Sequence, residues 1–332
     1  MFEEGTNSTG DITCTDTISG TDGAKSESCK INNTECTDST CNNKYYTHPA
    51  FTFGEEELEG FWIGKFELTG TISNITTKPN ISSLRNQRVG DFSTNIMAMN
   101  DTGNIYGFNT TTDTHMIKNI EWGAVAYLSY SKYGTCTDGI CQEIGINNNS
   151  SYTTGCGSSA GSSSSSTCNS YNTELGMHAS TTGNIYGVYD MSGGAYDYVM
   201  GNIVSSDGTT MMSGNDSGSN SGYTGILYRT NSSGDYTSYT GTYSYPSSKY
   251  YDKYSFGTSN SQRQRSKLGD GIKEVLNTSS RGWYSDYSSL AHSNFPWFNR
   301  GGNYSNGSGA GAFHSGYSSG AASTLTTHLA LS

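Results

Sequence analysis

The chain has 332 residues and a formal net charge of −11, and it is 32% hydrophobic, 14% charged and 12% aromatic. The acidic balance and the lack of a basic stripe exclude nucleic acid as a partner, and no apolar run approaches the roughly 20 residues that span a bilayer. Disordered chains are poor in aromatic as well as apolar residues, so we expect a globular core that carries long polar loops.

Eight cysteines lie in local groups, which favours disulfides. Cys136 with Cys141 and Cys156 with Cys168 would each close a polar loop, whereas the cysteines between residues 14 and 41 leave three pairings open. Zinc is disfavoured because no Cys-x-x-Cys pair occurs. Disulfides indicate an oxidising, extracellular setting. Residues 1–12 do not resemble a signal peptide, so we expect a removed signal or a longer parent chain.

Residues 1–48 form a polar arm without periodicity, which we expect to be irregular. The ordered domain begins near residue 49. The apolar residues of "FWIGKFELTG" predict a buried strand that ends in a turn at Gly70.

Two segments have the periodicity of helices that cover a sheet. In the first, "VGDFSTNIMAMN", the apolar residues at helical spacing are Val89, Phe92, Ile96 and Met99. In the second, "NIEWGAVAYLSYSKYG", we expect Asn119 to cap the helix and Gly134 to end it. The negative charge of Glu121 would stabilise the N-terminus of this helix. The face that would pack on the sheet is made of Ile120, Ala124 and Leu128.

Two long polar tracts separate the patterned segments. Residues 135–170 are a Ser/Gly loop, and residues 203–280 are too long for an ordinary loop, so we expect an insertion with some strand or turn content around "KYYDKYSFG" and "KLGDGIKEVL". The hexapeptide "TGNIYG" occurs at residues 102–107 and 182–187, and we interpret it as a reused turn that leads into a short strand.

The C-terminal part combines core and polar residues. Phe295, Trp297 and Phe298 predict a core strand that enters a turn at Gly301 and Gly302. Residues 303–324 are almost wholly Gly, Ser, Ala, Asn and Tyr, and Leu329 to Leu331 would form a closing strand.

Four of these segments resemble, in family order, motifs of the formylglycine-generating-enzyme-like (sulfatase-modifying-factor) family. They are "FWIGKFELTG", "MIKNIEWGAVAYLSYSKYG", "NIYGVYDMSGGAYDYV" and "FNRGGNYS". The resemblance covers residues 49–332, with 203–280 as an insertion. It implies an α+β, C-type-lectin-like fold: a mixed twisted sheet with two helices and a high loop content. The C-terminal segment departs from the family's usual ending, G-F-R-x-x-L, because Thr326 to Leu331 lack its aromatic residue and its Arg.

The family includes oxidising enzymes that use a cysteine pair near the C-terminus. Here the last cysteine is Cys168, and the late histidines His292, His314 and His328 lack metal-ligand spacing, so we expect no enzymatic activity. A residual oxidase or metal-dependent hydroxylase remains the alternative, and a structural surface-layer or pilus-associated domain is another.

The same family includes the variable proteins of diversity-generating retroelements, which bind ligands through the segment after R-G-G. The resemblance places a display segment at about residues 299–326. Its composition of Asn, Ser, Tyr and Gly matches the residue types that are enriched in antibody loops. A plain flexible tail could have the same composition. The residues that we expect to bind a ligand are Asn299, Asn303, Tyr304, Ser305, Asn306, Ser308, His314, Ser315, Tyr317 and Ser318.

In relatives that hold calcium, the turn in "YDMSGGAYD" supplies oxygen ligands. Matched residue by residue, the Ca²⁺ ligands would be Asp190, Gly193, Ala195 and Asp197. The competing interpretation is a glycine turn whose Asp residues accept hydrogen bonds from local N–H groups. Otherwise we expect no cofactor.

The sequence therefore predicts a non-enzymatic adhesion or receptor-binding module outside the cell, on a bacterial cell surface or a phage virion. Its partner would be a protein or glycan on another cell or virion surface, with no nucleic acid and no membrane span in this segment.

Overall fold

The computed structural model describes residues 12–18, 25–31, 34–35, 48–206, 211–212, 221–223, 228–230, 236–238, 246–261, 265–277, 280–318 and 320–332. They form an α+β fold with few helices and several small sheets. The elements in chain order are β1 (Ile12–Ile18), β2 (Lys25–Ile31), β3 (Thr34–Glu35), η1 (Pro49–Phe51), β4 (Thr52–Phe53), β5 (Glu56–Glu57), β6 (Trp62–Ile63), β7 (Thr69–Thr71), β8 (Asn74–Thr76), α2 (Val89–Met97), η2 (Ala98–Asn100), β9 (Thr114–Met116), α3 (Asn119–Ser129), β10 (Cys136–Thr137), β11 (Ile140–Cys141), α4 (Glu174–Met177), β12 (Tyr196–Ile203), β13 (Tyr228–Thr230), β14 (Tyr236–Ser238), η3 (Ser248–Tyr250), β15 (Asp252–Tyr254), η5 (Trp283–Ser285), β16 (Trp297–Gly301), η6 (Gly307–Gly309), β17 (Gly311–Ser318), β18 (Leu325–Thr326) and β19 (Leu329–Leu331).

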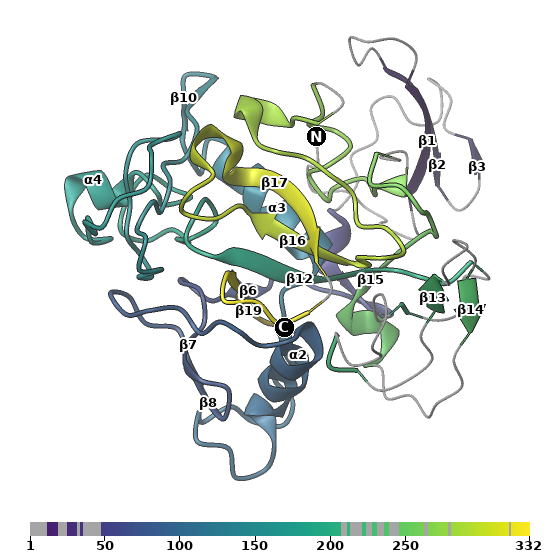
Figure 1. Cartoon of the computed structure of the whole chain (residues 1–332), viewed down its shortest axis with the longest axis horizontal. Coiled ribbons are helices and arrows are strands. Elements are labelled where there is room, and N and C mark those ends of the chain that lie inside the picture. The colour runs from purple at the N-terminus through teal and green to yellow at the C-terminus, as the bar shows by residue number, and fades with distance from the viewer. Residues whose placement is uncertain are drawn as a thin grey trace.

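The central sheet has the strand order β15-β12-β16-β17, and β18 also pairs with β12 (Figure 1). It is mixed, because β12 runs parallel to β15 and β18 but antiparallel to β16. A second sheet has the order β6-β19-β9, so the last strand of the chain lies between two strands from its first half. The predicted closing strand at Leu329 to Leu331 is confirmed.

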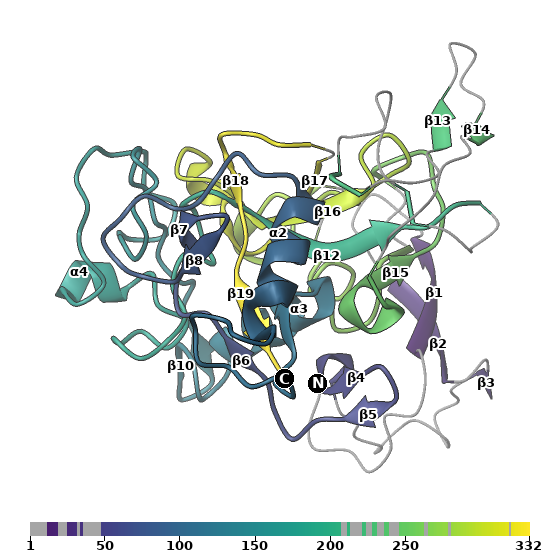
Figure 2. The same cartoon turned by 90° about the horizontal axis from the view of Figure 1, so that it is seen from below.

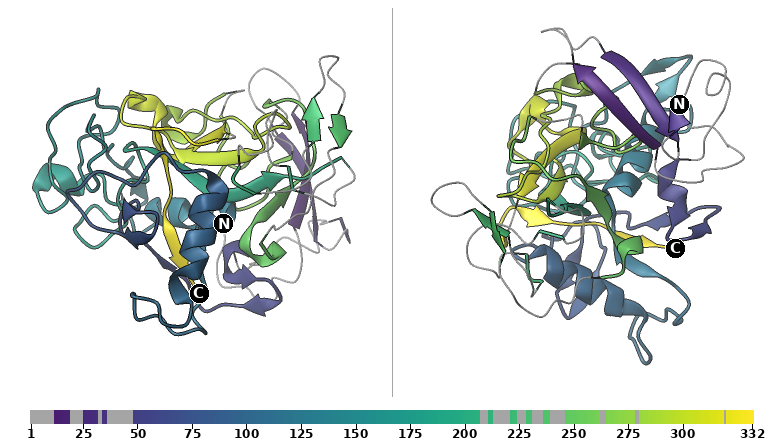
Figure 3. Two further views of the ribbon diagram at one scale, coloured as in Figure 1. Left: turned by 60° about the horizontal axis from the view of Figure 1, so that its bottom comes forward. Right: turned by 90° about the vertical axis from the view of Figure 1, so that its right-hand side faces the viewer.

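The central sheet is covered on both faces. Neighbouring residues on a strand point to opposite faces, and Trp297 and Phe298 accordingly join different apolar clusters. Phe298 packs in the cluster that contains Trp122 of α3, whereas Trp297 packs in the cluster that contains Phe92 of α2. Figure 2 shows both helices beside the yellow strand β19, and Figure 3 shows β16 and β17 over β12 from two further directions.

The Arg300 guanidinium joins the main elements from inside the core, where it is fully buried. Its Nε donates to the backbone oxygen of His314 on β17 at 2.8 Å. Its Nη1 donates to Asn119 Oδ1 at the start of α3, at 2.9 Å, and to the backbone oxygen of Asp270 at 2.7 Å. A planar group with five N–H donors suits such divergent acceptors, so this one side chain links two strands, a helix and a turn.

Helix α3 differs from the sequence expectation in its cap and in its buried face. Its N-cap is Lys118, whose backbone N–H donates to Glu121 Oε2 at 2.8 Å. The predicted cap, Asn119, binds Arg300 and donates to the Tyr254 hydroxyl instead. The predicted face is wrong because Leu128 is 52% exposed. The Trp122 side of the helix faces the core instead, because the ring is buried and its Nε1 donates to the Ala312 oxygen at 2.7 Å.

Two other segments depart from expectation, and a third agrees with it. The predicted strand in "FWIGKFELTG" is reduced to β6 and the start of β7, and Gly70 lies in β7 and not in a turn. Trp62 is 77% exposed, although Phe66 and Leu68 are buried. The N-terminal arm contains the antiparallel strands β1 to β3 where irregular chain was expected. Much of the 203–280 tract lies outside the described residues, but its predicted strand content is confirmed by β15, which pairs with β12.

The repeated hexapeptide is a reused turn, as predicted. Asn104 Oδ1 accepts from the Tyr106 backbone N–H and Asn184 Oδ1 accepts from the Tyr186 backbone N–H, each at 2.9 Å. An Asn side chain that bonds two residues ahead forms its own turn without a strand. Neither copy leads into the strand that we expected.

Replacing Arg300 by Lys tests the central role of the buried guanidinium. A lysine has one nitrogen in place of three, so Arg300→Lys leaves buried acceptors unbonded and lowers the free energy of unfolding by about 3–5 kcal/mol. Urea denaturation of both proteins measures this change. Arg281→Lys is the matched control, because Arg281 is exposed, and it should stay within about 0.5 kcal/mol of the parent. Equal losses for both variants would contradict the prediction.

Candidate functional site

The loop between β16 and β17 carries the most exposed of the predicted ligand-binding residues. Ser305 and Ser308 are exposed, and Tyr304 and Asn306 are half-buried. Tyr317 and Ser318 are also half-buried, but they lie at the far end of β17, where Tyr317 contacts the rings of His292 and Phe295. The structure therefore separates the predicted residues into two places.

Four of the predicted contact residues are buried and need to be reassigned as supports. Asn299, Asn303, His314 and Ser315 are 7%, 8%, 3% and 0% exposed. Asn303 Oδ1 accepts from the Ser305 backbone N–H at 3.0 Å, and Ser315 Oγ donates to the Ser289 oxygen at 2.6 Å. His314 Nδ1 lies 2.8 Å from the Gly309 oxygen. These side chains shape the loop and do not form its outer surface.

Tyr304 belongs to a cluster that the sequence analysis did not find. Its ring meets the Tyr152 ring edge-on, with centroids 4.8 Å apart. The Arg85 guanidinium carbon lies 3.9 Å from the centre of the same Tyr152 ring. Tyr152 reaches this position because its backbone oxygen accepts from the Ser83 N–H at 2.9 Å. Three distant segments of the chain thus meet at one aromatic side chain.

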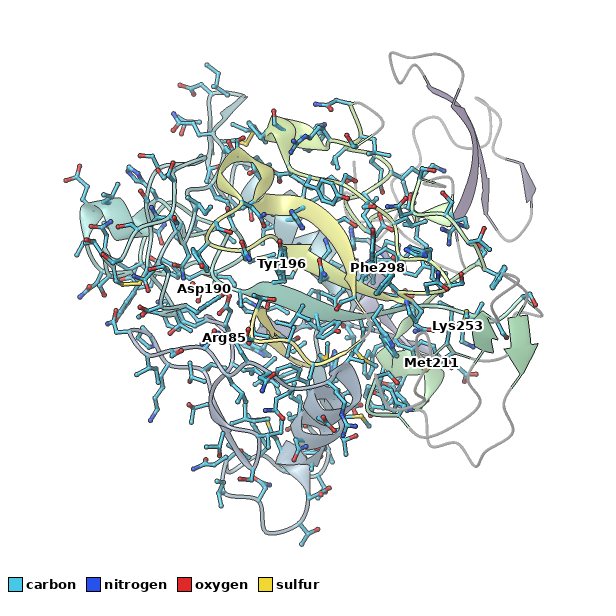
Figure 4. The ribbon with its side chains drawn as sticks, viewed as in Figure 1. Arg85, Asp190, Tyr196, Met211, Lys253 and Phe298 are labelled. Carbon is cyan, nitrogen blue, oxygen red and sulfur yellow. A yellow bond between two sulfur atoms is a disulfide. The ribbon has the colours of Figure 1, made fainter. Side chains whose placement is uncertain are left out.

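Two further tyrosines extend the cluster around His314. The His314 ring lies 5.7 Å from the Tyr196 ring and 5.6 Å from the Tyr287 ring. Tyr196 lies within hydrogen-bonding reach of Asn306 on the loop between β16 and β17. Figure 4 places Tyr196 at the start of β12. We call Tyr152, Tyr196, Tyr287 and Tyr304 the tyrosine rim.

A second aromatic feature adjoins the rim, in residues 281–287. Tyr284 and Ser285 have positive φ angles of 58° and 76°, a region that is costly for residues other than glycine and that clusters at functional sites. The Tyr284 ring offsets this cost by stacking on Tyr130 at 4.9 Å. Trp283 remains 39% exposed and Tyr284 37% exposed. The only signal in the sequence is the pair of large aromatics in "GWYSDY".

The turn from Asp190 to Asp197 supports the rim from below. The Gly193 N–H donates to the Gly301 oxygen at 3.1 Å, and the Tyr304 N–H donates to the Gly194 oxygen at 3.0 Å. Both glycines have positive φ, and a Cβ on Gly194 would lie 2.4 Å from Glu67 Oε1. Gly194 is therefore a glycine because a buried carboxylate occupies the space that a side chain would need.

The predicted calcium ligands do not fit a calcium ion. Asp190 Oδ1 accepts from Asn147 Nδ2 at 2.8 Å and from the Gly155 N–H at 2.9 Å, and its Oδ2 accepts from the Gly155 N–H at 3.1 Å. Asp197 Oδ1 lies 2.9 Å from His328 Nδ1. Calcium requires six to eight oxygens, but protein groups already engage most of the oxygens of these carboxylates.

The competing interpretation is wrong in its detail, because the Asp190 carboxylate accepts from Gly155 and Asn147, which are distant in the sequence, and not from local N–H groups. Within the described ranges, no group of three or more His, Cys, Asp or Glu side chains is arranged to hold a metal ion. Nor does that part of the chain contain a helix with the length and apolar character to cross a bilayer.

Three buried carboxyl groups lie behind the rim with one histidine. Burial, followed by the charges of Asp190 and Asp197, raises the pKa of Glu67 well above its usual range. Burial also raises the pKa of Asp190, to about 6, and that of Asp197. Burial lowers the pKa of His328, but the adjacent Asp197 carboxylate outweighs it and the pKa is raised. Burial and the two neighbouring carboxylates thus favour the protonated form of Glu67.

The pKa of Glu67 predicts a pH-dependent stability. Above its unfolded pKa of about 4.3, the unfolded chain has lost the proton that folded Glu67 keeps, so stability falls by up to about 1.4 kcal/mol per pH unit as pH rises towards the folded pKa. Glu67→Gln removes this titrating group, so the free energy of unfolding of the variant should fall less steeply between pH 6.5 and 8.5. Urea denaturation at several pH values measures the slope.

Two features make the comparison of slopes specific. Burial lowers the pKa of His48 and His314 to about 4, whereas an unfolded histidine has a pKa of about 6.5, so the loss of their unfolded-state charge contributes equally to the parent and the variant. Glu174→Gln is the matched control, because Glu174 is exposed, and it should keep the parental slope. If Glu67→Gln also keeps it, Glu67 is ionised in the folded protein.

The rim is thus defined by contacts within this chain. The disulfides Cys136–Cys141 and Cys156–Cys168 confirm the predicted local pairs, and the second closes the loop that carries Gly161 beside Ser308.

Comparison of the chain with protein-family models found no match, and comparison with the curated proteins found none either.

Proposed function

We propose that this chain is a non-enzymatic binding module that contacts a partner through the tyrosine rim and the adjoining loop 281–287. The single observation that carries the proposal is the convergence of Tyr152, Tyr196, Tyr287 and Tyr304 from four separate segments. Tyrosine provides a large contact area at a low cost in side-chain entropy, which is why binding loops are rich in it.

The exposure of these side chains suits a contact surface. Tyr287 is 37% exposed, and Tyr152, Tyr196 and Tyr304 are half-buried. Each ring therefore has a packed side that fixes its position and an open side that can meet a ligand. Binding to a preorganised surface loses less conformational entropy than binding to mobile groups. The Ser305 and Ser308 side chains add exposed hydrogen-bonding groups beside the rings.

We also propose a C-type-lectin-like fold of the formylglycine-generating-enzyme-like family. In support, three of the four resembling motifs are adjacent in space. The "EWGAVAY" helix packs behind the sheet through Trp122, the "RGG" arginine bonds to that helix, and the "DMSGG" turn bonds to Gly301. The mixed central sheet and the two main helices agree with the same architecture.

An extracellular location on a cell or virion surface is part of the proposal. It is supported by the two disulfides, which form in oxidising compartments. The partner would be a protein or a glycan on another surface. The alternative, a copper- or iron-dependent oxidase, would bind its metal stoichiometrically and consume O₂, and a metal titration with an oxygen electrode distinguishes it.

Replacing Tyr304 by Ala tests the rim as the contact surface. The experiment incubates the labelled protein with an array of purified glycans and a panel of purified surface-protein ectodomains, and then measures the affinity of each positive by surface plasmon resonance. Tyr304→Ala should weaken every positive roughly 10- to 100-fold, because a central tyrosine contributes about 1.5–3 kcal/mol.

The control is Tyr186→Ala, since Tyr186 is 84% exposed on a turn that lies outside the rim. It should leave every affinity unchanged. Tyr304→Phe keeps the ring contact with Tyr152, and it should retain most of the affinity if stacking dominates. Affinities unaffected by Tyr304→Ala, in a protein of unchanged melting temperature, would refute the rim as the binding surface.

A further inference from the structure

We propose that Arg85 is an anion-binding residue at the edge of the tyrosine rim, and that it recognises the carboxylate of a terminal acidic sugar on a glycan. The inference rests on the proposed function and adds the chemical class of the ligand. It is based on the geometry of one guanidinium, on the distribution of charge around it, and on the polar character of the surface beside it.

Arg85 is held in place but lacks an acidic partner. Its guanidinium packs 3.9 Å above Tyr152, Nη2 donates to Ser82 Oγ at 3.3 Å, and Nη1 donates to the Ser323 oxygen. Each terminal nitrogen carries two hydrogens, so among the described residues one hydrogen on each nitrogen has no protein acceptor. Among the described residues, no carboxylate forms an ion pair with this side chain.

The three segments that meet at Arg85 contain no acidic residue. They are residues 78–88, 144–172 and 303–324, which contain no Asp or Glu although the chain has 29, and Asp91, which follows the first segment, is paired with Arg88 at 2.7 Å. Backbone bonds join the three segments: the Ser83 N–H donates to the Tyr152 oxygen at 2.9 Å, and the Asn86 N–H donates to the Ala322 oxygen at 3.0 Å. A chain of net charge −11 thus has one surface where an anion meets no repulsion from its nearest side chains.

The same surface is rich in hydroxyl groups and poor in apolar side chains. Ser82, Ser151, Ser159, Ser305 and Ser308 are exposed. Within the described part of these three segments, Ile81 is the one large apolar residue that is exposed, at 42%. A protein partner would require an apolar centre, whereas a sugar presents hydroxyls to polar groups and a C–H face to an aromatic ring. These features favour a glycan over an acidic protein loop.

Arg85 and Tyr304 are placed to act together on such a ligand. They contact the same Tyr152 ring, the first through its guanidinium and the second ring to ring at 4.8 Å. The planar guanidinium pairs with a carboxylate through parallel N–H donors. The sugar ring attached to that carboxylate would then lie over the Tyr304 side of the rim.

A glycan array with matched neutral and acidic members tests the inference. The probes are lactosamine, the same glycan with a terminal sialic acid, a sulfated lactosamine and a uronic acid oligosaccharide. The parent protein should bind the carboxylate-bearing glycans and not neutral lactosamine, and rising NaCl concentration should weaken the binding. Arg85→Gln should weaken it roughly 10- to 100-fold, as expected for the loss of a charge-assisted hydrogen bond.

Two further variants isolate the role of the guanidinium. Arg85→Lys keeps the charge but lacks the planar pair of donors, so it should bind more weakly than the parent and more tightly than Arg85→Gln. Lys253→Gln removes an exposed charge on β15, which Figure 4 shows well apart from Arg85, and should bind as the parent does. Melting temperatures confirm that the variants are folded, and the Arg85→Lys comparison stands even if Arg85→Gln fails to fold.

The outcomes separate this inference from the proposed function. Equal binding of neutral and acidic glycans, or acidic binding that survives Arg85→Gln, overturns the role of Arg85 and leaves the rim as the contact surface. Sulfate binding without carboxylate binding overturns the assigned sugar class. Binding of a purified protein ectodomain, with no glycan bound, overturns the inference, and its sensitivity to Tyr304→Ala then decides the proposed function.

Discussion

The arrangement of this protein depends on one buried cation. Arg300 bonds to Asn119 at the head of α3, to the Asp270 oxygen and to the His314 oxygen on β17. A guanidinium withdrawn from water is unfavourable unless its donors are satisfied, so these elements must be in place together. The strand that carries Arg300 ends in Gly301 and Gly302, with φ of 79° and 73°, and the display loop follows directly. The interaction that orders the core therefore also fixes where the rim begins.

Local patterns predicted the parts of the fold that depend on neighbouring residues. Both main helices, the strand at Trp297 and Phe298, the closing strand and the two small disulfide loops follow from spacing along the chain. The buried face of α3 could not be predicted in this way, because it depends on a bond from Trp122 to Ala312 across the domain. The predicted N-cap of α3 was wrong for a similar reason, since the Asn119 side chain bonds to Arg300 instead.

The candidate site was predicted only in part, again because of distance along the sequence. The loop with Tyr304 has a recognisable composition, but Tyr152 and Arg85 join it through contacts between residues that are 152 and 67 positions apart. Composition also cannot separate an Asn that faces solvent from one that holds a turn, and Asn303 belongs to the second kind. Asp190 and Asp197 were predicted as calcium ligands, but in the structure Asp190 accepts from a backbone N–H and Asp197 contacts His328.

The hydrogen bonds inside the display loop have a consequence for its outer surface. Asn306 Oδ1 accepts from the Asn303 backbone N–H at 2.7 Å, the Asn306 N–H donates to the Asn303 oxygen at 3.0 Å, and the Gly309 N–H donates to the Asn306 oxygen at 2.9 Å. The loop keeps its shape through these two asparagines and the main chain, without help from the side chains at 304 and 308. Substitutions at those two positions would therefore change the outer surface of the loop and leave the hydrogen bonds that hold its backbone in place.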